Sequence, residues 1–249
     1  HGPTLNVRAQ LTQPDVLGPY SELRASVNYD VNVDYAFQYH GPRTLLGISR
    51  SLWANRVNVG LSHNFQALDF FNSSIDNSAK AQYLFGYVDP YFVGYFQQDV
   101  SLDLRDRQLD ARKGVYAAVS AQEGGPFAAG QFWFEKLVPD VRGYVPLGRH
   151  VVLAARLTFG QIWVQGDLAS PITQRFYLGG PNSHRGFNYN RLSLQVCSRK
   201  RIGAPQNTAE YRPDCGEAVP EGTELLVAAH THARVSNAAL ARSRLGGVG

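Results

Sequence analysis

The stretch Tyr29-Asp30-Val31-Asn32-Val33-Asp34-Tyr35-Ala36-Phe37-Gln38-Tyr39 decides the fold class of this chain. Its odd positions are aromatic or aliphatic, while its even positions are polar or small, which is the period of a β-strand and not of a helix. The unbroken alternation predicts one strand from 29 to 39. Strands of soluble proteins usually have about five or six residues, whereas a tilted strand that crosses a bilayer needs about 9–11. The length of the pattern therefore favours a membrane-spanning strand.

The same alternation recurs along the first two thirds of the chain. Segments 57–65 and 151–159 alternate regularly, and less regular candidate strands cover 5–12, 45–53, 79–87, 91–104, 114–121 and 132–145. Glycine, proline and short polar stretches separate these segments, as expected of turns. No helix longer than two turns is predicted. The pattern predicts an all-β antiparallel meander of about 9–11 strands, forming part of a transmembrane β-barrel.

Alternation alone does not show which face of the strands is wet. In a membrane barrel the apolar face meets lipid and the polar face lines the lumen, which would place Asp30, Asn32, Asp34 and Arg156 inside. A passive channel or porin would share this arrangement. A soluble β-sandwich binding module would have the same strands with the apolar face turned inward.

Composition excludes several other classes of protein. Aromatic residues make up 12% of the chain and charged residues 18%, which excludes a disordered acidic or basic tail. The net charge is +4, and we interpret the basic cluster at 199–201 as a solvated loop and not as a nucleic-acid site. Phosphate-loop, dinucleotide and nucleophile-elbow motifs are absent, and His230 and His232 lack a third metal ligand. We therefore expect no enzyme activity, no metal and no cofactor.

The alternation stops in a long segment from 164 to 222. The centre of this segment, residues 175–187, reads Arg-Phe-Tyr-Leu-Gly-Gly-Pro-Asn-Ser-His-Arg-Gly-Phe. Loops of this length are typically functional or disordered. The glycine pair permits backbone shapes that other residues avoid, so a turn can present Arg185 at its tip. A guanidinium inside a polar barrel requires carboxylate or carbonyl partners.

This segment resembles the signature loop of the outer-membrane protein assembly and translocation superfamily, also called the bacterial surface antigen barrels. That family includes BamA, TamA and the two-partner-secretion transporters. The positions that match its pattern are Phe176, Gly179, Gly180, Ser183, Arg185, Gly186 and Phe187. His184 departs from the small aliphatic residue that is frequent before the arginine. Upstream, 104–107 with 113–116 resembles the family's Arg-Asp turn, and 143–147 with 151–160 resembles the strand pair that leads into the loop.

The resemblance implies a fold, a function and a location. The fold is a sixteen-stranded barrel that follows POTRA domains. The signature loop enters this barrel from outside, and its arginine, Arg185 here, docks on acidic residues of the inner wall. Turns 105–113 and 146–149 are then periplasmic, and the connection 124–130 is extracellular. The function is insertion of outer-membrane proteins or translocation of polypeptides in the bacterial outer membrane. The implied partners are membrane lipid, client polypeptides and periplasmic or lipoprotein assembly factors.

Cys197 and Cys215 are the two cysteines of the chain, and both lie in the long segment. An exported protein meets an oxidising compartment, so we expect a disulfide, which would contribute about 3 kcal/mol. Some members of the family carry a comparable pair.

The expected organisation is a partial barrel at 1–222, including the extracellular loop 164–222, followed by residues 223–249. This last part contains one possible strand, at 224–235, and a tail without alternation. Because family barrels continue through further strands, we expect the chain to be a fragment or to end in a shifted reading frame.

Overall fold

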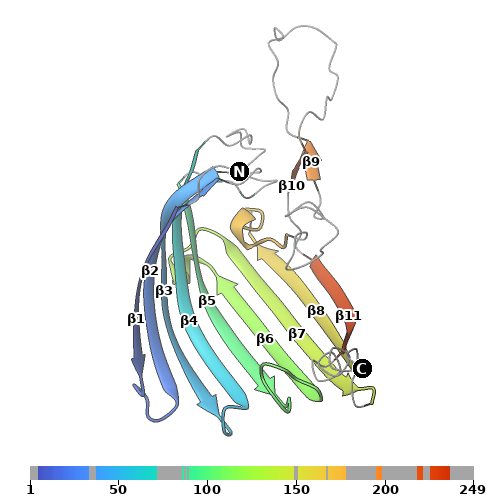
Figure 1. The fold of residues 1–249 in the computed structure, drawn as a ribbon. Coiled ribbons are helices and arrows are strands. Elements are labelled where there is room, and N and C mark those ends of the chain that lie inside the picture. The colour runs from blue at the N-terminus through green and yellow to red at the C-terminus, as the bar shows by residue number, and fades with distance from the viewer. Residues whose placement is uncertain are drawn as a thin grey trace, which may run out of the picture.

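A computed structural model describes residues 5–33, 38–71, 86, 88, 90–148, 151–166, 168–177, 195–197, 218–220 and 225–235. Within these residues, nine antiparallel strands form one sheet in the order β1-β2-β3-β4-β5-β6-β7-β8-β11. The strands are β1 Leu5–Pro14, β2 Ser21–Val33, β3 Gln38–Leu52, β4 Val57–Phe71, β5 Tyr91–Asp103, β6 Gly114–Gly124, β7 Trp133–Pro146, β8 Val151–Gln165 and β11 Leu225–Val235. The sheet curls into an open, partial barrel (Figure 1). This confirms the predicted all-β meander.

Four short elements complete the described structure. The strands β9 Gln195–Cys197 and β10 Ala218–Pro220 pair in a separate two-stranded sheet. Two 3₁₀ turns, η1 Pro126–Ala128 and η2 Ile172–Gln174, follow β6 and β8 respectively. No helix in the described ranges is long and apolar enough to cross a bilayer.

The exposed apolar side chains form rows on the outer face of the sheet. On β8, Leu153, Leu157 and Trp163 are 39%, 53% and 48% exposed, whereas Ala154 and Ile162 on the opposite face are buried. The outer row on other strands includes Leu5, Val7, Leu11, Val27, Tyr29, Leu46, Val59, Leu61, Val100, Val115, Val119, Val141, Val145, Leu225 and Val227. A β-sandwich would bury this face, so the soluble sandwich interpretation is wrong. An outer surface of this kind suits lipid.

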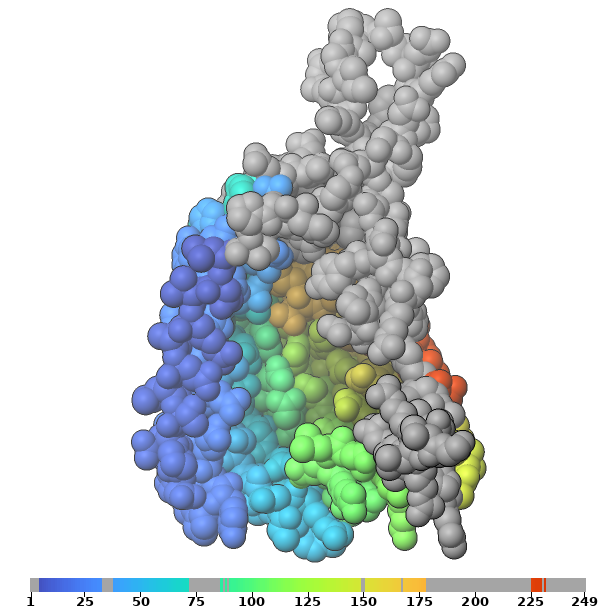
Figure 2. All heavy atoms as spheres, viewed as in Figure 1, coloured from blue at the N-terminus to red at the C-terminus, as the bar shows by residue number. Residues whose placement is uncertain are grey.

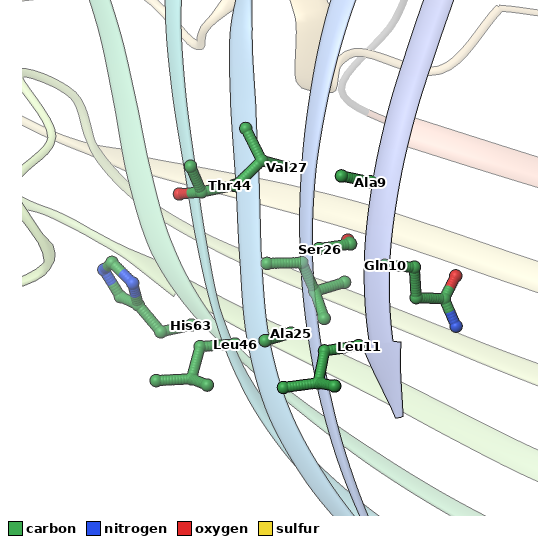
Figure 3. Close-up of a pocket in the computed structure, with 10 residues that line it drawn as sticks. Ala9, Gln10, Leu11, Ala25, Ser26, Val27, Thr44, Leu46 and His63 are labelled. Atoms are coloured by element: carbon green, nitrogen blue, oxygen red, sulfur yellow. The ribbon is translucent and has the colours of Figure 1, made fainter. Parts of the chain in front are cut away.

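The outer face carries a shallow depression across β1 to β4. Small residues, Ala9 and Ala25, lie between the larger Leu11, Val27 and Leu46 there. Figure 3 shows the side chain of Leu11 on one side of its strand and that of the preceding residue on the other, as the period of a strand requires.

The buried core lies on the concave face, near the end of the barrel that carries the longer connections. It consists of Tyr39, Leu68, Tyr91, Val93, Tyr95, Phe132, Phe134, Ile162, Ile172 and Phe176. Figure 2 looks into this hollow and shows the orange segment that follows β8 inside it. The core is therefore formed between the inner wall and residues of a loop, not between two sheets.

The single strand predicted across 29–39 is wrong. β2 ends at Val33 and β3 begins at Gln38, and these two residues pair, so the segment is a hairpin whose residues 34–37 lie outside the described ranges. Paired residues share a face of a sheet. Val33 has an odd number and its partner Gln38 an even one, yet both lie on the same face. Odd-numbered residues therefore point outward on β2 but inward on β3. Tyr39 is therefore buried in the lumen, at 8% exposure, instead of facing lipid.

The other predicted strands are present, with one exception. β1, β3, β4, β6 and β8 are longer than predicted, β7 is shifted by one residue, and β5 and β11 are each one residue shorter. The exception is the predicted segment 79–87, of which only Gly86 is described. β8 continues to Gln165, so the long connection begins slightly later than expected. β11 pairs with β8 along its whole length and is part of the same sheet.

Two aspartates organise the turn between β5 and β6. The guanidinium of Arg105 donates to both carboxylate oxygens of Asp103, at 2.8 and 2.7 Å, and this pairing raises the pKa of Arg105. Asp106 Oδ1 accepts hydrogen bonds from the backbone N–H groups of Arg112 and Lys113, at 3.0 and 3.2 Å. The Arg-Asp pair noted in the sequence therefore closes the turn through side-chain and backbone hydrogen bonds.

The stability of this turn should depend on the ionisation of Asp106. The backbone donors of Arg112 and Lys113 hold the pKa of Asp106 below its ordinary value of 3.8. Because the folded-state pKa is the lower one, the carboxylate stabilises the turn above pH 3.8, and this is lost as the pH falls through the folded-state pKa. We expect Asp106→Asn to speed hydrogen exchange of both amides at neutral pH. The amide of Leu104, which donates to the carbonyl of Val115, is the internal control. Unchanged exchange at Arg112 and Lys113 would contradict this role.

Candidate functional site

The segment 168–177, named here the loop stem, lies against the inner wall of the barrel. Tyr91 on β5 is fully buried, and its hydroxyl lies 3.1 Å from Thr173 Oγ1 and accepts a hydrogen bond from the Thr173 backbone at 3.3 Å. Lys136 on β7 donates from Nζ to the carbonyl oxygen of Gln174 at 2.7 Å. Two strands on opposite sides of β6 thus hold the same turn of the stem.

Phe176 of the stem lies directly over β8. Its ring is 9% exposed, and a Cβ placed on Gly160 would lie 2.5 Å from its Cζ. Any side chain at Gly160 would therefore displace the ring. Lys136 Nζ lies 4.6 Å from the centre of the same ring, at cation–π distance. The glycine and the lysine together form a seat for one aromatic side chain.

The stem also has hydrogen bonds of its own. The buried Arg175 donates from Nε to Ser170 Oγ at 2.9 Å. Tyr177 donates from its hydroxyl to the carbonyl of Ile172 at 2.9 Å, and Ile172 is buried in the core. These contacts fix the shape of the stem, so it meets the wall as a formed unit.

Further along the lumen, β7 and β8 carry a cluster of charges. Asp140 accepts hydrogen bonds of 2.6 Å from Arg142 Nε, Arg156 Nε and Thr158 Oγ1. Arg142 and Arg156 are directly opposite each other on the paired strands. Tyr116 on β6 continues the cluster, with the guanidinium of Arg142 5.1 Å from its ring centre. One carboxylate therefore serves two arginines.

A second charged pair lies on the inner face of β2 and β3. Arg43 Nε lies 3.1 Å from Asp30 Oδ2, and Arg43 donates from Nη2 to the hydroxyl of Tyr39 at 2.6 Å. Asn6 on β1 also donates to Asp30. Asn32 pairs with Tyr39 and shares its inward face. Asp30, Asn32 and Arg156 thus lie on the lumen side, while Asp34 lies outside the described residues.

Comparison with known proteins identifies the family. The family model of the Omp85 superfamily domain matches residues 4–212. The chain belongs to the Omp85 superfamily. This confirms the resemblance seen in the sequence, and it makes the protein a barrel of the membrane-protein assembly and translocation family, typical of outer membranes.

One known protein is similar to this chain in sequence, and one solved structure is similar to it in fold. The mouse (Mus musculus) sorting and assembly machinery component 50 homolog is 32% identical over 94 residues, which are 38% of this chain and 20% of that protein. The crystal structure of BamA from Haemophilus ducreyi lacking POTRA domains 1–3 is similar in fold, with a TM-score of 0.73 at 14% identity. That match covers 97% of this chain and 51% of the BamA chain. The chain thus spans about half of that structure.

Of the seven signature-loop positions, one lies within the residues that the structure describes. Phe176 is described, whereas the remaining positions, Gly179, Gly180, Ser183, Arg185, Gly186 and Phe187, lie outside the described residues. Cys197 is in β9, where its backbone pairs with Ala218, and Cys215 lies outside the described ranges. Over the residues that are described, no group of three metal-ligating side chains occurs.

Sequence reasoning did not single out Lys136, Asp140, Arg142 or Gly160 as site residues. A signal existed for the first three, since they occupy alternate positions of a predicted strand and must share one face. No signal marked Gly160, because its role depends on a ring sixteen positions later in the chain.

Proposed function

We propose that this chain forms part of a bacterial outer-membrane barrel that inserts outer-membrane proteins or translocates polypeptides, without enzyme activity or a cofactor. The observation that carries the proposal is the loop stem seated on the inner wall through Tyr91, Lys136 and Gly160. A passive pore needs no such plug against its wall. The outward apolar rows support a location in the membrane.

The stem acts in this proposal as a brace. It connects β5, β7 and β8, and so it stiffens one side of the sheet. A barrel that opens elsewhere at a seam exposes unpaired backbone groups, and a client strand can add to them by β-augmentation. The bracing keeps the other strands in register while the seam is open.

Arg185 completes the brace in this proposal, as the signature arginine. A guanidinium in the lumen is stabilised by carboxylate partners on the wall. Membrane lipid, client polypeptides and periplasmic or lipoprotein assembly factors are the proposed partners.

The test is an insertion assay with the protein in phospholipid vesicles. We expect the vesicles to speed the folding of a small, urea-unfolded outer-membrane barrel protein, and we expect Arg185→Ala to remove most of this acceleration and to lower the heat stability. Arg199→Ala is the matched control, because this arginine lies in the same long connection but outside the signature motif. Full acceleration and unchanged heat stability in Arg185→Ala would refute the role of the arginine.

The same vesicles separate assembly from passive conduction. Rapid release of a small trapped solute, with no acceleration of client folding, would show a channel and overturn the proposed function.

We also propose a disulfide between Cys197 and Cys215. The pairing of β9 with β10 supports it, because it brings together the two parts of the long connection that carry the cysteines. Closing this loop would contribute about 3 kcal/mol by restricting the unfolded chain. Mass spectrometry of the unreduced protein should find the linked peptides, and two alkylated thiols would contradict the pairing.

A further inference from the structure

Two neighbouring turns form a pocket at the end of the barrel that carries the short turns. The first connects β1 to β2 and the second connects β3 to β4, and the backbone N–H of Ser51 donates to the carbonyl of Tyr20 at 2.9 Å. The pocket has a volume of about 550 Å³. Its lining consists of Pro19, Tyr20, Arg50, Ser51, Leu52, Trp53, Ala54 and Asn55.

The backbone around this pocket is strained. Of the six non-glycine residues with positive φ in the described part of the chain, five lie in these two turns: Asp15, Tyr20, Trp53, Ala54 and Asn55, with φ between 50° and 66°. Left-handed geometry costs free energy at residues other than glycine, and such strain concentrates at functional sites. The strain accompanies two exposed aromatic rings, since Tyr20 is 70% and Trp53 65% exposed.

The charge at the pocket is positive and lies on the outer face. Arg50 pairs with Val59, whose side chain belongs to the apolar outer row, so Arg50 points to the same side. No acidic residue lines the pocket, and no ion pair to Arg50 is present among the described residues. Arg56 adds a second guanidinium, 5.7 Å from the ring centre of Trp53.

Outward charges at the opposite end of the barrel have the opposite sign. The other charged residues at outward positions of the described strands are Asp69, Glu123 and Glu135, near the longer connections. Anionic headgroups would be repelled there and attracted to Arg50. The lipid-facing surface therefore distinguishes its two ends by charge.

We propose that the pocket formed by the two turns binds the headgroup of an anionic phospholipid. Its phosphate contacts Arg50, the charged residue of the lining, while Arg56 next to Trp53 adds positive charge nearby. Tyr20 and Trp53 occupy the boundary between headgroups and acyl chains, where aromatic residues are enriched. Because Arg50 continues a row that meets acyl chains, its ligand must lie at the membrane surface. The inference rests on the barrel being embedded in a bilayer, which the proposed function also requires.

The test measures which lipid contacts Trp53. Trp133→Phe and Trp163→Phe leave Trp53 as the single tryptophan. The full chain is reconstituted in phosphatidylcholine vesicles that contain phosphatidylglycerol, with one or the other lipid brominated near its headgroup. We expect phosphatidylglycerol to associate with Trp53 more strongly than phosphatidylcholine does. Each arginine should contribute a factor of about five to this preference, since one basic residue near an anionic surface contributes about 1 kcal/mol. Arg50→Gln should lower the preference for phosphatidylglycerol about fivefold. Raised salt should also weaken this preference, because it screens the attraction between arginine and headgroup.

Arg24→Gln is the matched control. Arg24 lies at the same end of the barrel but faces inward and pairs with Glu22 at 2.5 Å, so its loss should leave the lipid preference unchanged. Equal quenching by both lipids in the parent protein would overturn the proposal. An equal loss of the lipid preference in Arg24→Gln and Arg50→Gln would also overturn it. The same holds if free phosphate displaces phosphatidylglycerol from Trp53 as effectively as added phosphatidylglycerol does. Flotation with the vesicles is scored separately: a chain that fails to float contradicts the membrane barrel itself, whereas a floating chain without preference contradicts only the lipid site.

Discussion

Phe176→Ala should lower the free energy of unfolding by about 3–5 kcal/mol, the usual cost of truncating a buried phenylalanine. The ring is 9% exposed, packs against Gly160 and lies under the ammonium group of Lys136. Its removal leaves a cavity on the wall and frees the stem. The measurement is the unfolding midpoint in detergent, with limited proteolysis between 168 and 177 as a second readout. We expect faster cleavage in the variant.

A double-mutant cycle tests whether Phe176 acts through its seat. Gly160→Ala alone should destabilise the protein, because the added Cβ would lie 2.5 Å from the ring. In the Phe176→Ala background the same change should cost little, since the ring is gone. Phe159→Ala is the matched control, because this ring faces outward at 38% exposure. An equal cost of Gly160→Ala in both backgrounds would contradict the contact.

Asp140→Asn should destabilise the barrel by about 2–3 kcal/mol, at or just below the lower limit of the roughly 3–5 kcal/mol that breaking a fully buried ion pair costs. The change leaves Arg142 and Arg156 opposite each other without a carboxylate, and like charges at opposed positions of a sheet repel. The cost is moderated because the side chains of these arginines are 37% and 43% exposed to the lumen. The measurement is the thermal unfolding midpoint in detergent at low salt.

Two further measurements isolate the electrostatic origin of this loss. Raised salt should restore part of the stability, because it screens the repulsion between exposed guanidinium groups. Arg156→Gln should also restore part of it when combined with Asp140→Asn. A low-salt midpoint of Asp140→Asn equal to that of the parent would show that the cluster contributes nothing to stability.

Period-two alternation predicted the fold because it follows directly from strand geometry. Val59 and Leu61 on β4, and Leu153 and Leu157 on β8, face outward as the pattern requires, with Arg156 between them inside. These are local properties, since each side chain's direction depends on its neighbours in the same strand. The preference for a lipid-facing outer side rested on the length of the pattern at 29–39, which is not one strand. The strands of the sheet nevertheless have 10–15 residues, which is long enough for a tilted membrane-spanning strand.

The reversal between β2 and β3 could not be predicted from the same pattern. Both arms of the hairpin alternate, so periodicity continues through the turn, and the segment carries no glycine or proline to mark it. The face of Tyr39 depends on the pairing of Val33 with Gln38, which is a property of register and not of the alternation itself.

The contacts that hold the loop stem on the inner wall could not be predicted from the sequence pattern either. Tyr91 and Thr173 are 82 positions apart, and Lys136 and Gln174 are 38 positions apart. Contacts of this kind arise from the curling of the sheet around the loop, and no local spacing encodes them. Of the signature motif, Phe176 lies within the described residues, and the residues that contact its ring were identified only from the structure.

The most direct test of the central claim is the accessibility of consecutive β8 positions in lipid vesicles. Single cysteines at 153–158, in a Cys197→Ser and Cys215→Ser background, are labelled with a nitroxide and probed with oxygen and a water-soluble nickel complex. Oxygen, which concentrates in lipid, should relax the labels at Leu153, Ala155 and Leu157. The nickel complex should relax those at Ala154, Arg156 and Thr158. The reverse pattern, or no alternation, would contradict an apolar face toward lipid and a polar lumen inside.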